Sequence, residues 1–118
     1  MSSMMIRFTE KPVLHTTSTV QSIYQAIDLG GHYRVLDTIL AVYTLTGTAE
    51  ATLRVETSME ATDDDQWVTI HAFPKVSFVN TFVLGNMSGA LRYVRYGLTL
   101  SGAGSVVFDI SGYARTEL

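Results

Sequence analysis

The stretch "EATLRVETSME", residues 50–60, alternates between two sets of side chains. The more apolar set is Ala51, Leu53, Val55, Thr57 and Met59, and the polar set is Thr52, Arg54, Glu56, Ser58 and Glu60. Successive side chains of a β-strand point to opposite faces of its sheet. The alternation therefore predicts a strand with one face in a hydrophobic core and the other in water.

Other segments of the chain have the same period or are rich in β-branched residues. They are residues 4–9, 19–29, 35–46, 66–73, 76–84, 91–101 and 106–114. Glycine, proline or aspartate clusters separate them, as turns require, and no long segment has the apolar spacing of a helix. Short strands at this spacing are typical of sandwiches and barrels. We predict an all-β fold: an antiparallel β-sandwich of about eight strands, jelly-roll-like, with an extended N-terminal arm.

The segment "VVFDISGYA", residues 106–114, shows how a strand would be oriented in this sandwich. Val106, Phe108 and Ile110 share one face, which we expect to point inward, while Asp109 and Ser111 point outward. Gly112 interrupts the pattern, and glycine inside a strand often marks a bulge or a bend. We therefore expect an irregularity at Gly112.

Composition narrows the class of protein. The chain has 118 residues, enough for one domain, and only 16% of them are charged, against about a quarter in an average protein. A net charge of −3 and only two lysines, Lys11 and Lys75, argue against a nucleic-acid partner. The chain has no cysteine, no apolar run long enough to span a membrane and no signal-peptide pattern. We expect a soluble protein made in the cytoplasm, with no membrane partner.

Two of the expected strands are apolar on both faces. In residues 35–45, Ile39, Ala41, Tyr43 and Leu45 oppose Leu36, Leu40 and Val42; in residues 76–84, Val76, Phe78, Phe82 and Leu84 oppose Val79 and Val83. An antiparallel strand with two apolar faces needs cover on both sides. Either part of the same chain covers the second face, or that face is a subunit interface, because monomers rarely expose large apolar patches. The pattern does not say which face points inward.

The first 18 residues differ from the rest of the chain. They contain one short apolar run, a proline and a Thr/Ser stretch. We predict an extended arm at residues 1–18 and the sandwich domain at residues 19–118. The arm packs either on its own domain or on a neighbour, and Ile6 and Phe8 are its candidate contact residues.

The search for chemistry identifies no active site. His15, His32 and His71 are scattered and lack the spacing of zinc ligands. The acidic loop at residues 60–65 has carboxylates but not the glycine and the distant glutamate of a calcium loop, so a solvated turn is the favoured interpretation. Nucleophile-elbow and P-loop motifs are absent. We predict no enzyme activity, no cofactor and no metal.

The stretch "ALRYVRYGLTL", residues 90–100, places Tyr93 and Arg95 on the outward face of a strand. Tyrosine and arginine are the residue types that favour partner contacts. The alternative is internal: Arg95 lies over a tyrosine ring or pairs with Glu56 or Asp109 across the sheet. Trp67 is a further partner-binding candidate, or an anchor of the core or of a hairpin edge.

Three segments carry a resemblance: "VETSMEATDDDQWVTI" (55–70), "RYVRYGLTLSG" (92–102) and "FDISGYAR" (108–115). In this order the chain resembles, over residues 28–115, small β-sandwich virion proteins of tailed bacteriophages, such as capsid decoration proteins and head or tail accessory proteins. The resemblance implies a structural protein of the virion that docks on a capsid or tail lattice and stabilises it. It implies a homo-oligomer, which we expect to be a trimer, and a partner that is the major capsid protein or another virion protein.

A second resemblance leaves an alternative open. Galactose-binding-like and discoidin-like sandwiches have a similar arrangement of Trp and "RYVR", which implies a carbohydrate-binding module. In that case Tyr93, Arg95 and Trp67 would line one groove.

Overall fold

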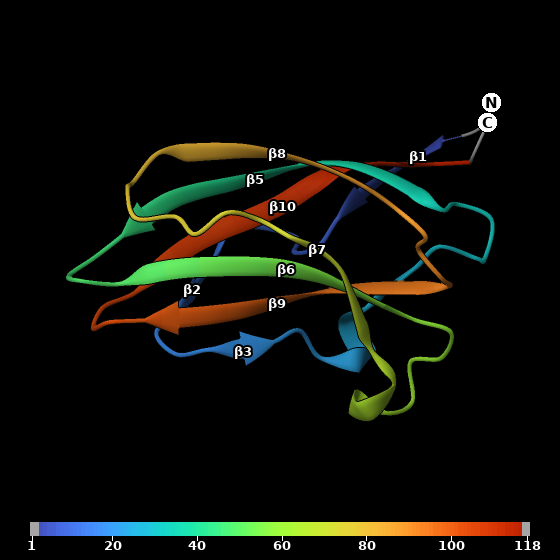
Figure 1. The fold of residues 1–118 in the computed structure, drawn as a ribbon, viewed down its shortest axis with the longest axis horizontal. Coiled ribbons are helices and arrows are strands. Elements are labelled where there is room, and N and C mark those ends of the chain that lie inside the picture. The colour runs from blue at the N-terminus through green and yellow to red at the C-terminus, as the bar shows by residue number, and fades with distance from the viewer. Residues whose placement is uncertain (1–2, 117–118) are drawn as a thin grey trace.

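The computed structural model describes residues 3–116, which form ten β-strands and two 3₁₀ turns (Figure 1). The strands are β1 (Ser3–Arg7), β2 (Val13–His15), β3 (Thr19–Val20), β4 (Ile27–Asp28), β5 (Val35–Leu45), β6 (Glu50–Ser58), β7 (Val68–Ala72), β8 (Thr81–Ser88), β9 (Tyr93–Ser101) and β10 (Val106–Arg115). The 3₁₀ turns are η1 (Ile23–Gln25) and η2 (Asp64–Gln66). The period-two alternation in the sequence accounts for this all-β content.

The strands form two antiparallel sheets that pack face to face, so the predicted β-sandwich is confirmed (Figure 1). Sheet A has the order β1-β10-β5-β8, with β2 also paired to β10. Sheet B has the order β3-β9-β6-β7, with β4 also paired to β9. β1 and β2 share one strand position, as do β3 and β4, so the ten segments fill eight positions. Numbered along the chain, these positions have the orders 1-8-3-6 and 2-7-4-5, which is the double Greek key of a jelly roll.

The core lies between the sheets and uses the expected faces of β6, β9 and β10. Its members are buried to 5% exposure or less and include Ala51, Leu53, Val55, Val94, Tyr96, Leu98, Val106, Phe108 and Ile110. Met59, expected on the same face as Leu53, is 63% exposed because β6 ends at Ser58. In β5 the face that points inward is that of Leu36, Leu40 and Val42. The opposite face of β5, which carries Ile39, Ala41 and Tyr43, therefore points away from the core.

Two expected strands differ from the structure by more than two residues at an end or are interrupted. The segment 19–29 is interrupted by η1, where the side chain of Ser22 accepts a hydrogen bond from the backbone N–H of Tyr24. The segment 76–84 becomes a continuous strand only at β8, because Val76 makes an isolated bridge to Ala51 and residues 78–80 form a bend in which Asn80 has a φ of 54°. Asparagine tolerates this left-handed conformation better than most residues. The apolar residues before Asn80 are thus outside β8.

Gly112, where we expected a bulge or a bend, forms no bulge, because pairing with β5 continues through this residue without a register shift. The irregularity lies between Val107 and Phe108 instead. A Cβ atom at residue 112 would collide with the carbonyl oxygen of Asp37 on β5. Glycine is needed here for a close approach of two strands, and the alternation pattern does not reveal that contact.

Two parts of the segment expected to form an N-terminal arm, residues 3–7 and 13–15, are strands of sheet A, and residues 1–2 lie outside the described part of the chain. β1 pairs with residues 111–115 and β2 with residues 106–108, both on the same side of β10. Ile6 and Phe8 point into the core and are 2% and 3% exposed. β1 therefore extends the sheet at its edge and does not cover the outer face of β5.

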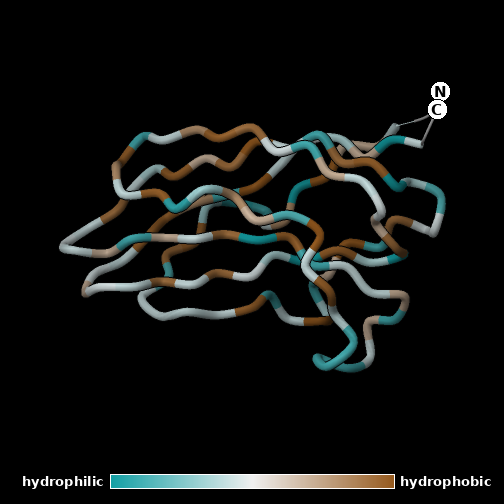
Figure 2. The backbone as a smooth tube through the Cα atoms, in the orientation of Figure 1, coloured by the Kyte–Doolittle hydropathy of each residue, from teal (hydrophilic) through white to brown (hydrophobic). Residues whose placement is uncertain are grey.

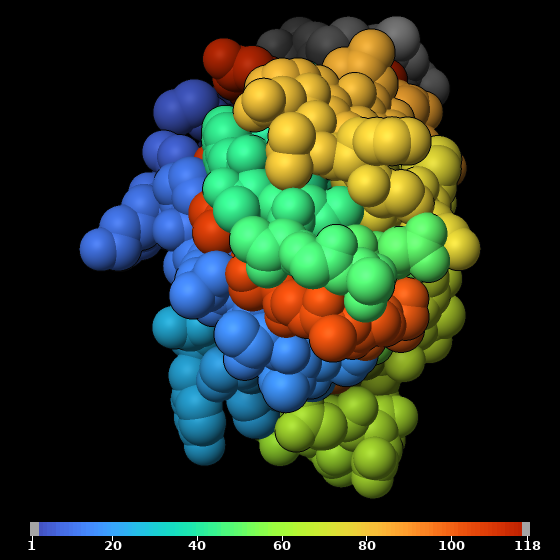
Figure 3. Space-filling view, turned by 90° about the vertical axis from the view of Figure 1, so that its left-hand side faces the viewer, coloured from blue at the N-terminus to red at the C-terminus, as the bar shows by residue number. Residues whose placement is uncertain are grey.

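At one end of the sandwich, two turns lie side by side: residues 46–49, between β5 and β6, and residues 102–105, between β9 and β10 (Figure 3, green and orange-red). Backbone N–H groups of Thr46 and Thr48 donate to the carbonyls of Ser105 and Ala103, at 3.0 and 2.9 Å. Gly102, with a φ of 78°, has no room for a Cβ atom beside the Thr48 carbonyl. This end of the fold is closed by backbone contacts.

Candidate interaction surface

The outer face of sheet A, which we call the apolar face, exposes large hydrophobic side chains from all four strand positions. Alternation along β1, β10, β5 and β8 points these residues away from the core. The exposed fractions are 81% for Leu84, 73% for Met5, 58% for Phe82, 56% for Tyr113 and 40% for Tyr43. Hydrophobic residues are visible along β8 at the edge of the fold (Figure 2). A contiguous apolar surface of this kind is unusual on a monomer.

The register between strands places these side chains in neighbouring rows. Met5 lies opposite Tyr113, Ile39 opposite Leu84, and Ala41 opposite Phe82. The rings of Tyr43 and Phe82 meet edge to face, with their centroids 6.4 Å apart. The apolar face is therefore one connected patch.

The apolar face also contains a hollow of about 500 Å³. Its lining includes three small residues, Ala41, Ser111 and Gly112, together with larger ones such as Met5, Tyr43, Phe82 and Tyr113. Small side chains next to large ones make the surface uneven. The protruding Leu84 follows Phe82 on β8 at the edge of the sheet.

Two ion pairs lie on the apolar face: Arg115 with Asp37, at 2.8 Å, and Arg7 with Asp109. A guanidinium nitrogen of Arg7 is 3.1 Å from Oδ2 of Asp109, and the hydroxyl of Tyr43 lies 3.5 Å from the same oxygen. Asp109 is only 3% exposed, so its charge is compensated beneath the surface. Asp109 was one of the two carboxylates suggested as a partner of Arg95. It pairs with Arg7 instead. The charges in this region cancel and leave the apolar face close to neutral.

The outer face of sheet B is covered by a different cluster, centred on Arg95. Its Nε donates to Glu56 at 2.8 Å, and one terminal nitrogen donates to Asp64 at 2.6 Å. The guanidinium carbon lies 4.4 Å from the centroid of the Trp67 ring. Arg54 also donates to Glu56, at 2.8 Å. The pair with Glu56, which was one of the internal alternatives to partner binding by Arg95, is present, and the loop that carries Asp64 and Trp67 covers this part of the sheet.

The five residues predicted to bind a partner fall into two groups. Ile6 and Phe8 lie in the core, and Arg95 is 3% exposed, so these three make their contacts inside the chain. Trp67 is half-buried, and its Nε1 donates to the backbone carbonyl of Asp63 at 2.9 Å. Tyr93 is half-buried under the guanidinium of Arg92, 5.1 Å from its ring centroid. The structure thus brings Arg95 and Trp67 together and leaves Ile6 and Phe8 in another region.

Sequence reasoning identified the apolar residues of β5 and β8 but missed Met5 and Tyr113. The outward set Asp109 and Ser111 continues to Tyr113 by simple alternation, so this residue had a signal in the sequence. Met5 had no such signal, because its strand was assigned to an arm. Only the β1–β10 pairing shows that Met5 and Tyr113 are neighbours.

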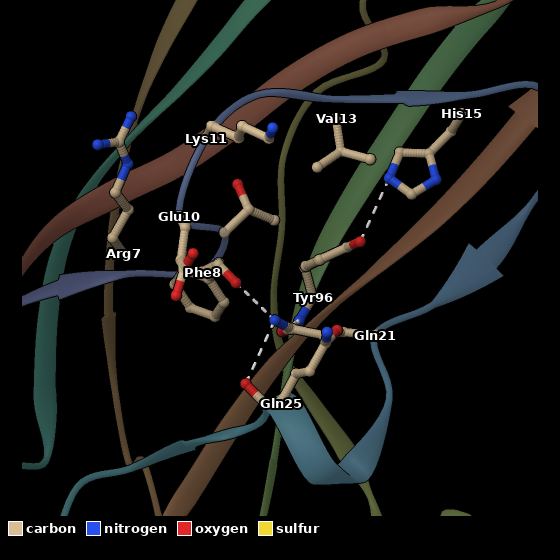
Figure 4. A pocket seen from close by; sticks show the side chains of 10 residues that line it. Arg7, Phe8, Glu10, Lys11, Val13, His15, Gln21, Gln25 and Tyr96 are labelled. Carbon is tan, nitrogen blue, oxygen red and sulfur yellow. Dashed lines mark hydrogen bonds between the residues drawn. The ribbon is translucent and has the colours of Figure 1, made fainter.

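A second cavity, of about 550 Å³, lies beside the segment that joins β1 and β2 (Figure 4). Gln21 is 4% exposed; its amide nitrogen donates to the carbonyls of Phe8 and Gln25, and its oxygen accepts from the backbone N–H of Tyr96. The Tyr96 hydroxyl lies 3.3 Å from Nε2 of His15. Burial lowers the pKa of His15 and raises the pKa of Tyr96. These buried groups thus hold β2 and η1 against β9.

The acidic loop at residues 60–65 uses its carboxylates within the chain. Asp63 accepts a hydrogen bond from the backbone N–H of Asp65 at 2.9 Å, and Asp64 pairs with Arg95. Within residues 3–116 no three or more His, Asp or Glu side chains come close enough together to hold a metal. Asp63 therefore caps the turn, and Asp64 is an ion-pair partner.

The helical turns of residues 3–116 have three residues each, and no helix in this part of the chain could span a membrane. No family model, curated protein or solved structure matches the chain.

Proposed function

We propose that this protein is a non-enzymatic structural protein of a tailed-bacteriophage virion. It docks on a capsid or tail lattice and stabilises it through oligomeric interfaces, in the manner of a capsid decoration protein. The observation that carries the proposal is the apolar face, where Leu84, Met5, Phe82 and Tyr113 are each more than half exposed. Many functions use the jelly roll, so the surface and not the fold is the argument.

The physical mechanism is adhesion. Apolar surface removed from water contributes about 25 cal/mol per Å², so burying this face favours the assembled state. Anything that binds only the assembled form of a shell shifts the equilibrium toward that form. Copies arrayed on a lattice also bind with avidity, so that modest single contacts are enough.

The alternative, a carbohydrate-binding module, needs Tyr93, Arg95 and Trp67 to line a groove. Arg95 is 3% exposed and donates to Glu56, Asp64 and the carbonyl of Gln21. A guanidinium that is buried and already paired in this way is poorly placed to bind a sugar. This arrangement favours the structural proposal over the alternative.

The test is whether the protein is a component of purified particles. Virions from the phage or prophage whose genome encodes the chain are banded in a density gradient, and their proteins are quantified by mass spectrometry. We expect this chain in a fixed ratio to the major capsid or tail protein. Particles that form normally and lack the chain would contradict the proposal.

A matched pair of variants tests the surface itself. Leu84→Glu places a charge on the apolar face, whereas Tyr24→Glu changes a residue of η1 that is 91% exposed and lies outside that face. Both side chains are largely in water, so neither change disturbs the core. We expect Leu84→Glu to reduce the amount of the protein on particles at least tenfold and Tyr24→Glu to leave it unchanged. Equal incorporation of both variants would show that the apolar face is not needed for incorporation into particles.

A further inference from the structure

We propose that the apolar face binds the same face of a second copy of this chain, which gives a two-fold symmetric dimer in place of the trimer expected from the resemblance. The inference rests on the proposed function and names a second copy of the chain, not the capsid or tail lattice, as the occupant of the apolar face. In a two-fold interface the same patch is used on both sides, so the patch must be complementary to itself. The apolar face meets this condition in shape, in charge and in area.

The shape argument rests on a protrusion and a hollow in one face. Leu84 and Phe82 of β8 stand 81% and 58% exposed at one edge of sheet A. The hollow of about 500 Å³ extends toward the opposite edge, where Met5 of β1 and Ser111 of β10 help to line it. Side chains on two packed sheets interdigitate across about 10 Å. The apolar face therefore contains both a protrusion and a hollow that can receive the same protrusion of a second copy.

The strand order determines which symmetry fits. A two-fold axis that lies between the two faces and runs along the strands reverses the order β1-β10-β5-β8. It places β8 of each copy over β1 and β10 of the other. Leu84 then enters the partner copy's hollow, and the same contact occurs twice. An axis across the strands would instead stack β8 on β8 and place protrusion against protrusion.

The charges on the apolar face are paired with one another, so two identical faces can meet without strong repulsion. Like charges that meet across an interface cost several kcal/mol, which is the usual obstacle to self-association. Here both pairs of opposite charge are matched within the face: Arg7 with Asp109 at 3.1 Å and Arg115 with Asp37 at 2.8 Å. A near-neutral face does not select a strongly acidic or basic partner. It suits a second copy of itself.

The area is sufficient for a specific dimer. β10 and β5 pair over residues 106–115. Ten residues at about 3.3 Å each, across four strands about 4.8 Å apart, make a face of about 600 Å² per copy. A face-to-face pair buries about 1,200 Å² in total, which is at the lower end of the range for specific interfaces.

The first experiment measures molar mass by light scattering from about 1 to 500 µM. We expect the mass to rise from that of one copy, 13.0 kDa, to twice that value. Leu84→Glu, which acts at both halves of a two-fold interface, is expected to raise the dimer dissociation constant at least 100-fold, and Tyr24→Glu to leave it unchanged. A monomer at every concentration, a trimer, or a dimer unaffected by Leu84→Glu would each overturn the inference.

A second experiment tests the arrangement, and it is simple because the chain has no cysteine. Leu84→Cys and Ser111→Cys variants are mixed under mild oxidation. We expect the mixed disulfide to form at least tenfold faster than the disulfide within the Leu84→Cys variant alone. The opposite ratio would place β8 on β8 and refute the interlocking of protrusion and hollow.

These results separate the dimer from the virion role. A monomer that is still present on purified particles refutes the dimer and leaves the proposed function in place. A dimer of the predicted arrangement that is absent from particles refutes the function and leaves the dimer.

Discussion

Replacing Arg95 by methionine should destabilise the fold more than any change to an exposed ion pair. The guanidinium is 3% exposed and binds Glu56, itself 7% exposed, at 2.8 Å. Removing one partner of a buried pair typically costs about 3–5 kcal/mol, because the other charge stays buried without compensation. Glu56 keeps its hydrogen bond from Arg54, so we expect a smaller cost, about 2–4 kcal/mol.

The partner charges provide an internal control. The side chain of Asp64 is 69% exposed, so Asp64→Asn removes a solvated charge and should cost less than about 1 kcal/mol. The double variant Arg95→Met/Glu56→Met removes both buried charges at once. It should recover at least half of the loss seen in Arg95→Met, because no uncompensated carboxylate remains.

The assay is urea unfolding followed by far-ultraviolet circular dichroism and Trp67 fluorescence, with thermal unfolding as a second measure. A loss of about 3 kcal/mol corresponds to a lowering of Tm by about 12 °C for a domain of this size. Because Trp67 lies over Arg95, its emission should change in Arg95→Met even under native conditions. A loss below 1 kcal/mol, or a double variant less stable than Arg95→Met, would refute the reasoning.

Two further predictions concern the second cavity and the acidic loop. Burial lowers the pKa of His15 below its usual value of 6.5. As the pH falls, the His15 imidazole is therefore protonated in the unfolded chain before it is protonated in the folded protein. The free energy of unfolding should consequently fall as the pH drops from about 7 through 6.5 toward the pKa of His15 in the folded protein. His15→Gln should flatten that part of the profile, and an unchanged slope in this variant would contradict the assignment. Adding a chelator should leave Tm within about 1 °C, since Asp63 caps η2 and Asp64 pairs with Arg95. A drop of many degrees would instead indicate a calcium ion bound in the loop.

Much of the fold was predictable from local patterns. The alternation in residues 50–58 and 106–110 identified the core residues of β6 and β10, since a half-buried strand requires that period. Turn residues separated most of the strands at the right places. The breaks at η1 and before β8 were not predicted, because they depend on the Ser22 cap and the left-handed Asn80.

The candidate site was predictable only in part. Two apolar faces on residues 35–45 indicated an extra buried surface, but the pattern is symmetric and could not say which face is outside. Arg95 looked like a surface residue by its position in the alternation. Its burial depends on a loop more than 25 residues earlier in the chain, which brings Asp64 and Trp67 over the strand.

The sequence alone determined that this chain is a β-sandwich and which side of β6, β9 and β10 is buried. These properties follow from side-chain period, which is local. Only the tertiary structure decided that residues 3–7 are an edge strand, that Arg95 is internal, and that Leu84, Phe82, Met5 and Tyr113 share one exposed face. Those facts depend on pairing between segments as far apart as β1 and β10, and long-range register is not written in any single stretch of the chain.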